Sequence, residues 1–176
     1  MAQIIKDKAI VNDPWQLLEL AAEGEAPVIP PSGDLIVPLA VWDAHRDALR
    51  FRAGRIGVWI KPDDDPALIA EDLQLFGAVA VAFPKVADGR GYSTGRLLRE
   101  RYGYRGELRA VGDVQRDQLY FLWQCGFDAF ALRPGEDAEK ALSAFNELTE
   151  AYQSSAARPP LFRRRHAAST DRVERS

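Results

Sequence analysis

Short apolar runs that alternate with longer amphipathic stretches constrain this chain most. The runs are Ile56–Ile60, Ala78–Phe83, Leu108–Val111 and Ala129–Leu132. A strand covered on both faces needs a nearly continuous apolar run, and strand–helix alternation is typical of parallel sheets. The pattern predicts an α/β fold whose parallel sheet has about four or five strands from βα repeats, with Leu35–Leu39 as the fifth. Because so few strands cannot close an eight-stranded barrel, the sheet is open, half-(β/α)-barrel-like, or completed by dimerisation.

Helix signals stand between these runs. Asp65 and Pro66 supply an N-cap and a first-turn proline, and the apolar stripe that follows indicates a helix ending near Gly77. Val41 to Arg50 has helical composition, and Gly112 and Asp113 are expected to cap another helix. The strongest stripe runs from Ala138 to Tyr152.

The chain divides into three regions. Residues 1–34 contain many breakers and are predicted to be an irregular lead-in, whereas 35–153 form the α/β domain. Residues 154–176 have no apolar periodicity and are predicted to be a disordered, arginine-rich tail. A solvated tail explains these arginines more simply than contact with nucleic acid or a partner protein.

Composition excludes several classes of function. A formal net charge of -3 gives no global reason for binding nucleic acid or an anionic membrane. No segment approaches the roughly 20 apolar residues that cross a bilayer, and the first residues do not resemble a secretion signal. Cys125 is the single cysteine, which favours a cytoplasmic location and rules out an internal disulfide. No metal site is predicted, because His45 and His166 lie in unrelated segments and Asp65 in Asp63–Asp65 serves as a helix cap.

In a parallel sheet the strand-to-helix loops meet at the carboxyl edge, where such folds bind ligands. The polar residues expected at this edge are Lys61, Asp63, Lys85, Asp88, Arg90, Asp113, Arg116 and Arg133. We therefore expect a rim of mixed charge that includes local basic groups.

The loop from Phe83 to Ser93 is the most informative segment of this edge. Gly89 and Gly91 permit close approach of a ligand, and Ser93 is expected to cap the following helix. Arg90, with Arg96 or Lys85 nearby, supplies charge-assisted hydrogen bonds for an oxyanion. The alternative is a plain glycine turn with an N-cap, since the spacing matches no nucleotide-binding fingerprint.

Arg109 interrupts a buried strand, where a charge needs a partner. The candidate carboxylates are those of Asp88, Glu107, Asp113 and Asp117, and the result is either a structural ion pair or a ligand-binding arginine. Asp113, Lys85 and Arg109 are the candidate catalytic residues, although capping explains Asp113 more simply. Cys125 is predicted to be a core thiol.

The block DGRGYSTGRLLRERYGYRGELRAVGDVQRDQLYFLWQCGFDAFAL closely resembles the signature of the domain-of-unknown-function 934 family. The resemblance extends more weakly from about Leu35 to Tyr152. Gly95 stands where that family usually has alanine, and Val86 where it usually has an aromatic residue. The matching polar and glycine positions are Asp88, Gly89, Arg90, Gly91, Tyr92, Ser93, Arg96, Arg99, Arg109, Gly112, Asp113, Asp117 and Gln118.

Members of this bacterial family are commonly labelled oxidoreductases of sulfite reduction, a label that rests largely on association with sulfur-assimilation genes. The resemblance thus implies a cytoplasmic sulfur-assimilation protein with a small-oxyanion site at Asp88–Ser93, Arg96, Arg109, Asp113 and Asp117. No cofactor is assigned, because the sequence has no nicotinamide or flavin fingerprint. One alternative is a non-catalytic protein that docks on sulfite reductase or a related reductase. Another is a small lyase or isomerase that uses Asp113 with Lys85 or Lys61.

Overall fold

An eight-stranded sheet organises the protein, and the computed structural model describes residues 2–19, 27–85 and 88–145. The strands are β1 (Gln3–Lys6), β2 (Ala9–Asn12), β3 (Trp15–Leu17), β4 (Asp34–Pro38), β5 (Ile56–Ile60), β6 (Ala78–Phe83), β7 (Glu107–Gly112) and β8 (Ala129–Phe130). The helices are α1 (Leu39–Arg50), the 3-10 helix η1 (Pro66–Leu75), α2 (Arg90–Arg96) continued by the π-helical η2 (Leu97–Arg101), the 3-10 turn η3 (Arg116–Gln118) and α3 (Leu119–Gln124). Residues 138–145 are also helical.

The strand order is β2-β1-β8-β7-β6-β5-β4-β3. β3 to β8 run parallel, whereas β1 is antiparallel to both β8 and β2. The α/β prediction is confirmed. The prediction of four or five strands, all parallel, is wrong, because the segment before residue 34 adds three more strands and one of them, β1, runs in the opposite direction.

That segment was predicted to be an irregular lead-in, but it supplies the strands at both edges of the sheet. β1 and β2 form a hairpin whose turn residues, Asp7 and Lys8, both have positive φ. Such turns are usually marked by Asn-Gly or Gly-Gly, so the hairpin lacks its usual sequence signal. β3 has three residues and directly follows Pro14, which is a turn signal rather than a strand signal.

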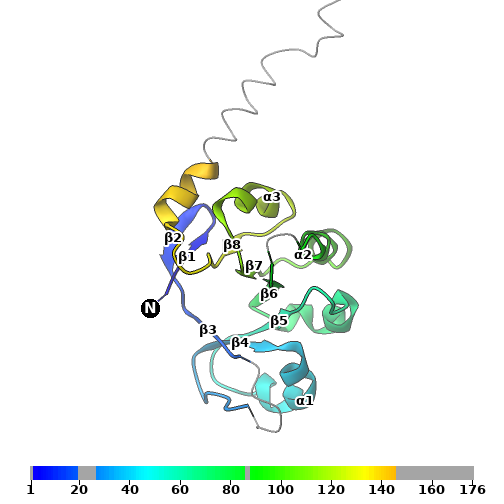
Figure 1. Cartoon of the computed structure of the whole chain (residues 1–176). Coiled ribbons are helices and arrows are strands. Elements are labelled where there is room, and N and C mark those ends of the chain that lie inside the picture. Colours follow the sequence, from blue (N-terminus) through cyan, green and yellow to red (C-terminus); the bar gives the residue numbers. More distant parts are fainter. Residues whose placement is uncertain (1, 20–26, 86–87, 146–176) are drawn as a thin grey trace, which may run out of the picture.

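The sheet curls into a half-barrel (Figure 1). β2 and β3 end it on opposite sides, yet only Asp13 and Pro14 separate them in the chain. Three steps between Cα atoms span at most about 11 Å, so the two outer strands must approach each other. The helices α1, α2 and α3 lie on the outer side of the curl, and the link between β2 and β3 crosses its open side (Figure 1).

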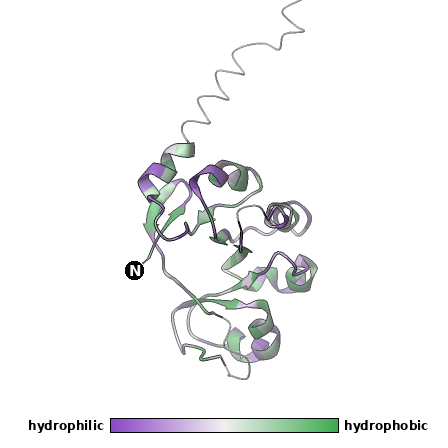
Figure 2. Cartoon of the chain, viewed as in Figure 1, coloured by the Kyte–Doolittle hydropathy of each residue, from purple (hydrophilic) through white to green (hydrophobic). Residues whose placement is uncertain are grey.

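The two faces of the sheet contact different apolar clusters. In β6, Val79 and Val81 point to the main core under the helices, whereas Ala78 and Ala80 belong to a smaller cluster on the inner face. Trp15 covers this inner cluster. Both clusters are buried, which explains why the strands read as continuous apolar runs (Figure 2).

An ion pair fastens the starts of two neighbouring strands. Asp34 accepts hydrogen bonds from the backbone N–H and the guanidinium of Arg55, the shortest at 2.5 Å. These bonds from Arg55 hold the pKa of Asp34 below its ordinary value. The contact ties the first residue of β4 to the residue that precedes β5.

Several predictions concern the end of the chain. The helix predicted from Ala138 to Tyr152 is observed as far as residue 145, and its remainder lies outside the described residues. The predicted tail at 154–176 lies outside them as well. Within the described part of the chain, no helix has both the length and the apolar character to span a membrane.

Candidate functional site

The carboxyl ends of β5, β6 and β7 lie side by side at one edge of the sheet. The backbone N–H of Asp113 donates to the carbonyl of Phe83 at 2.7 Å, so the loops after β6 and β7 start from adjacent positions. Lys61 directly follows β5 and is exposed. The structure therefore brings together loops that are far apart in the sequence.

A hollow of ≈370 Å³ opens at this edge, and we call it the edge hollow. Its lining residues are Trp59, Lys61, Pro62, Asp63, Ala82, Pro84 and Arg90. A smaller hollow of ≈180 Å³ shares Trp59 and Lys61 with it and is otherwise lined by Pro38, Leu39, Ala40, Asp43 and Asp64. Trp59 and Ala82 both pack against the smaller cluster, so this space lies on the inner face of the sheet.

Arg90 lies at the rim of the edge hollow between two carboxylates. Its guanidinium donates to both oxygens of Asp88, at 2.9 and 2.7 Å, and it also pairs with Asp63. These hydrogen bonds raise the pKa of Arg90 and lower that of Asp88. Asp88 is largely shielded and fixes the arginine, whereas Asp63 is 77% exposed and is the more easily displaced partner.

Lys61 supplies the second cation of the edge hollow. Its backbone N–H donates to Asp64 at 2.7 Å, which fixes the start of the loop. Its ammonium makes no hydrogen bond or ion pair with any other residue that the structure describes. A lysine without a partner at the ligand-binding edge is available to an anion.

The acidic run after β5 bonds to groups of its own loop and to Arg90. Asp65 accepts from the backbone N–H of Ala67 at 2.9 Å, which confirms the predicted cap of η1. Asp64 accepts a hydrogen bond from the backbone N–H of Lys61, and Asp63 forms an ion pair with Arg90. Among residues 2–19, 27–85 and 88–145, no three His, Cys, Asp or Glu side chains gather to hold a metal ion.

Two glycines of α2, Gly91 and Gly95, allow the helix to pack closely on the sheet. A Cβ atom on Gly91 would lie 2.5 Å from the ring of Phe83, and one on Gly95 would lie 2.4 Å from the ring of Phe127. Both rings are buried, so α2 can lie this close to the sheet only with glycine at these positions. Gly89, in contrast, faces open space.

Ser93 does not cap α2, contrary to the prediction. It lies inside the helix and is exposed, and Asp88 instead accepts from the backbone N–H of Arg90 at 3.2 Å. Arg96 and Lys85 are exposed as well. Tyr92 turns inward, packs its ring 5.5 Å from that of Phe83, and accepts a hydrogen bond from Gln118.

Asp113 lies at the same edge but does not cap the next helix. Gln115 and Gln118 cap η3 reciprocally, and Asp113 accepts instead from Arg133 and from Gln115, at 3.4 and 3.3 Å. Asp113 is thus paired with an arginine rather than with Lys85 or Lys61, the predicted acid–base partners. Asp117 is 91% exposed and faces solvent beside Arg116.

Arg109 lies away from this edge. It is aligned with Ala80 of β6 on the inner face, and it donates to Glu107 and, through two nitrogens, to Asp13 at 2.7 and 2.9 Å. Burial alone would lower the pKa of Arg109, but the hydrogen bonds to Asp13 and the charge of Glu107 outweigh it and raise that pKa. Of the predicted partners only Glu107 is correct, and Lys6 pairs with its other oxygen at 2.7 Å. The structural alternative therefore accounts for Arg109.

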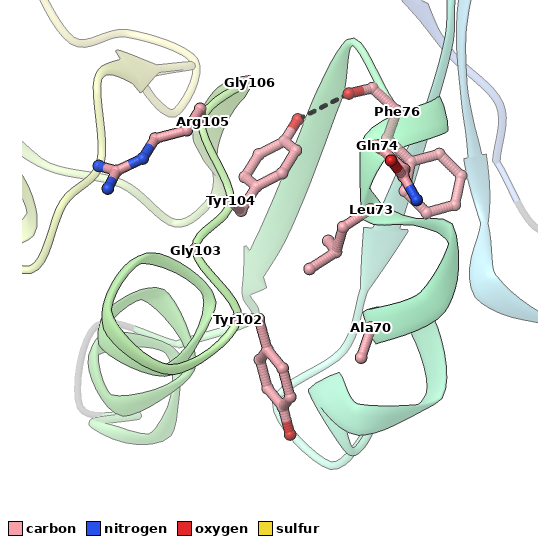
Figure 3. Close-up of a pocket in the computed structure, with 9 residues that line it drawn as sticks. All are labelled: Ala70, Leu73, Gln74, Phe76, Tyr102, Gly103, Tyr104, Arg105 and Gly106. Carbon is pink, nitrogen blue, oxygen red and sulfur yellow. Dashed lines mark hydrogen bonds between the residues drawn. The ribbon is translucent and has the colours of Figure 1, made fainter.

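A larger hollow lies near the start of β7, between η1 and the loop 102–106, and the sequence reasoning missed it (Figure 3). Its volume is ≈550 Å³, and its lining residues are Ala70, Leu73, Gln74, Phe76, Tyr102, Gly103, Tyr104, Arg105 and Gly106. The hydroxyl of Tyr104 donates to the carbonyl of Phe76 at 3.1 Å, and burial raises the pKa of this tyrosine. In Figure 3 the side chain of Arg105 points away from the hollow. In the sequence, the run Tyr-Gly-Tyr-Arg-Gly at residues 102–106 was the signal that could have indicated this hollow.

Arg99 holds this loop in place. Its guanidinium donates to the carbonyls of Tyr104 and Gly106 at 2.8 Å each and pairs with Asp128 at 2.6 Å. An arginine with four such bonds is a structural clamp. It joins the loop before β7 to the turn before β8.

The fold and the edge hollow define an α/β half-barrel protein with a small site of mixed charge at the carboxyl edge. Residues 57–162 match the family described as bacterial protein of unknown function (DUF934), so the chain belongs to that family. No curated protein and no solved structure matches the chain.

Proposed function

We propose that this protein binds an oxyanion in the edge hollow and acts through it in sulfite reduction. The observation that carries the proposal is that two cations border one hollow: the Lys61 ammonium, which has no partner among the described residues, and the guanidinium of Arg90, which Asp88 orients. Parallel α/β sheets bind ligands at this edge, and charge-assisted bonds to two cations suit sulfite or sulfate. The link to sulfur assimilation comes from the resemblance of the Asp88–Leu132 block.

The proposed site differs from the one expected from sequence. Arg90 and Asp88 stay in it, and Lys61 joins them. Arg109 leaves the site, because its guanidinium is buried and paired with both Asp13 and Glu107. A bound oxyanion would take the position of the Asp63 carboxylate on Arg90, since that exposed pair is easily exchanged.

Calorimetric titration with sulfite, sulfate and phosphate at low ionic strength tests the proposal. We expect Lys61→Met to weaken binding by about tenfold to a hundredfold, the value of one charge-assisted hydrogen bond. Lys140→Met is the matched control, because Lys140 is an exposed lysine outside the site, and it should leave the affinity unchanged. Equal affinities of wild type and Lys61→Met would contradict the assigned site.

The role in sulfite reduction needs a separate test. A strain that lacks this protein should recover growth on sulfite with the wild-type gene but not with the Arg90→Gln variant. Full recovery with the variant would show that growth on sulfite does not depend on oxyanion binding by Arg90.

A second candidate function is docking on a reductase without catalysis. It is favoured by two exposed aromatic side chains on α3, Phe121 at 59% and Trp123 at 41%. Co-purification of sulfite reductase with the wild type, but not with Phe121→Ser, would support it. Binding that survives this change would place the interface elsewhere.

A further inference from the structure

We infer that the oxyanion bound in the edge hollow is carried by a flat organic group, as in a sulfate, sulfonate or phosphate ester of an aromatic ring. This inference rests on the proposed function. Its basis is the size of the edge hollow, the apolar part of its lining, and the fixed position of one indole.

The edge hollow is too large for an inorganic oxyanion alone. Its ≈370 Å³ falls within the range of about 300–1,000 Å³ that is typical of organic-ligand sites. Sulfite, in contrast, has only four heavy atoms. An ion held by Lys61 and Arg90 would leave most of the space unfilled.

The remaining wall is apolar. Pro62, Ala82 and Pro84 line it together with the indole of Trp59. These groups offer a bound ligand dispersion contacts and a ring face but no charge. A ligand that fills the edge hollow therefore needs an apolar part attached to its anionic end.

The indole is fixed before any ligand arrives. Trp59 lies on β5, is half-buried, and donates its indole N–H to the carbonyl of Leu18 at 3.0 Å. Its polar group is thus satisfied within the protein, and the ring remains as a rigid surface that also borders the smaller hollow. A preorganised ring lowers the entropic cost of stacking a second ring on it.

The test compares paired probes by calorimetry: phenyl phosphate with inorganic phosphate, and phenyl sulfate with inorganic sulfate, with phenol as the uncharged control. We expect each ester to bind about tenfold more tightly than its inorganic ion, since stacking on one aromatic side chain is worth up to a hundredfold. Trp59→Leu should remove this advantage and change the affinity for the inorganic ion less than about twofold. Trp123→Leu is the matched control on α3.

A second variant covers the case in which Trp59→Leu fails to fold. Ala82→Phe fills the edge hollow from a half-exposed position, and it should abolish the preference for the esters while Lys61 still binds phosphate. Equal affinities of wild type for an ester and its ion, or an ester preference that survives Ala82→Phe, would overturn the inference and leave the oxyanion site standing. Binding of neither probe would remove both proposals. Binding of the esters alone would support the inference and restrict the proposed function to organic oxyanions.

Discussion

Replacing Arg109 by methionine tests whether this arginine is structural. The guanidinium is 4% exposed, and its loss leaves the carboxylates of Asp13 and Glu107 buried without their shared cation. Removing one partner from a buried ion pair costs about 3–5 kcal/mol. Lys6 still neutralises Glu107, and Asp13 still accepts from the backbone N–H of Trp15, so we expect the lower end, about 3 kcal/mol.

Urea unfolding at neutral pH measures this loss directly, and a thermal melt should show a fall of about 6–12 °C for a chain of this size. Arg101→Met is the control, because Arg101 is exposed and should change the free energy of unfolding by less than about 0.5 kcal/mol. Folded Arg109→Met should bind phosphate with wild-type affinity. A destabilisation below about 1 kcal/mol, or lost phosphate binding in the folded variant, would refute the reasoning.

Three further predictions concern other parts of the molecule. Gly91→Ala should destabilise the protein by about 1–3 kcal/mol in urea unfolding, because its Cβ would meet the buried ring of Phe83, whereas Gly89→Ala, which faces open space, should not. The native pKa of Asp34 is lowered by the neighbouring arginine, so its stabilisation is present above about pH 4 and is lost as the pH falls through that lowered pKa. Asp34→Asn should therefore show a smaller loss of stability on acidification, and an unchanged loss would contradict this. Asp63→Asn removes the carboxylate that competes for the rim guanidinium and should tighten phosphate binding several-fold in calorimetry, whereas weaker binding would assign Asp63 to the site itself.

The parts of the fold that sequence could predict are those whose signal is local. β5 and β6 are continuous apolar runs, and the cap of η1 by Asp65 is a two-residue pattern. β1 and β3 gave no such signal, because strands of three or four residues gain their stability from partners that are remote in the sequence.

The same limit applies to the candidate site. The position of Arg90 and Lys61 at one edge follows from the direction of the strands, which the apolar runs already indicate. Of the two partners of Arg109, Asp13 could not be found, since it is 96 residues away in a segment without a visible pattern. Gly91 was misread for a related reason, because the ring that requires a glycine belongs to the preceding strand.

The amino-terminal strands have a practical consequence for anyone who shortens this protein. Residues 3–17 supply the outermost strands on both sides of the sheet, so a single truncation would uncover the free edge of β8 and that of β4 at once. The family match starts at residue 57, and a fragment cut to that boundary would also lose β4. Unprotected backbone N–H and C=O groups along two edges invite strand-to-strand association between copies. We therefore expect such a fragment to aggregate, even though it keeps every residue proposed to contact the oxyanion.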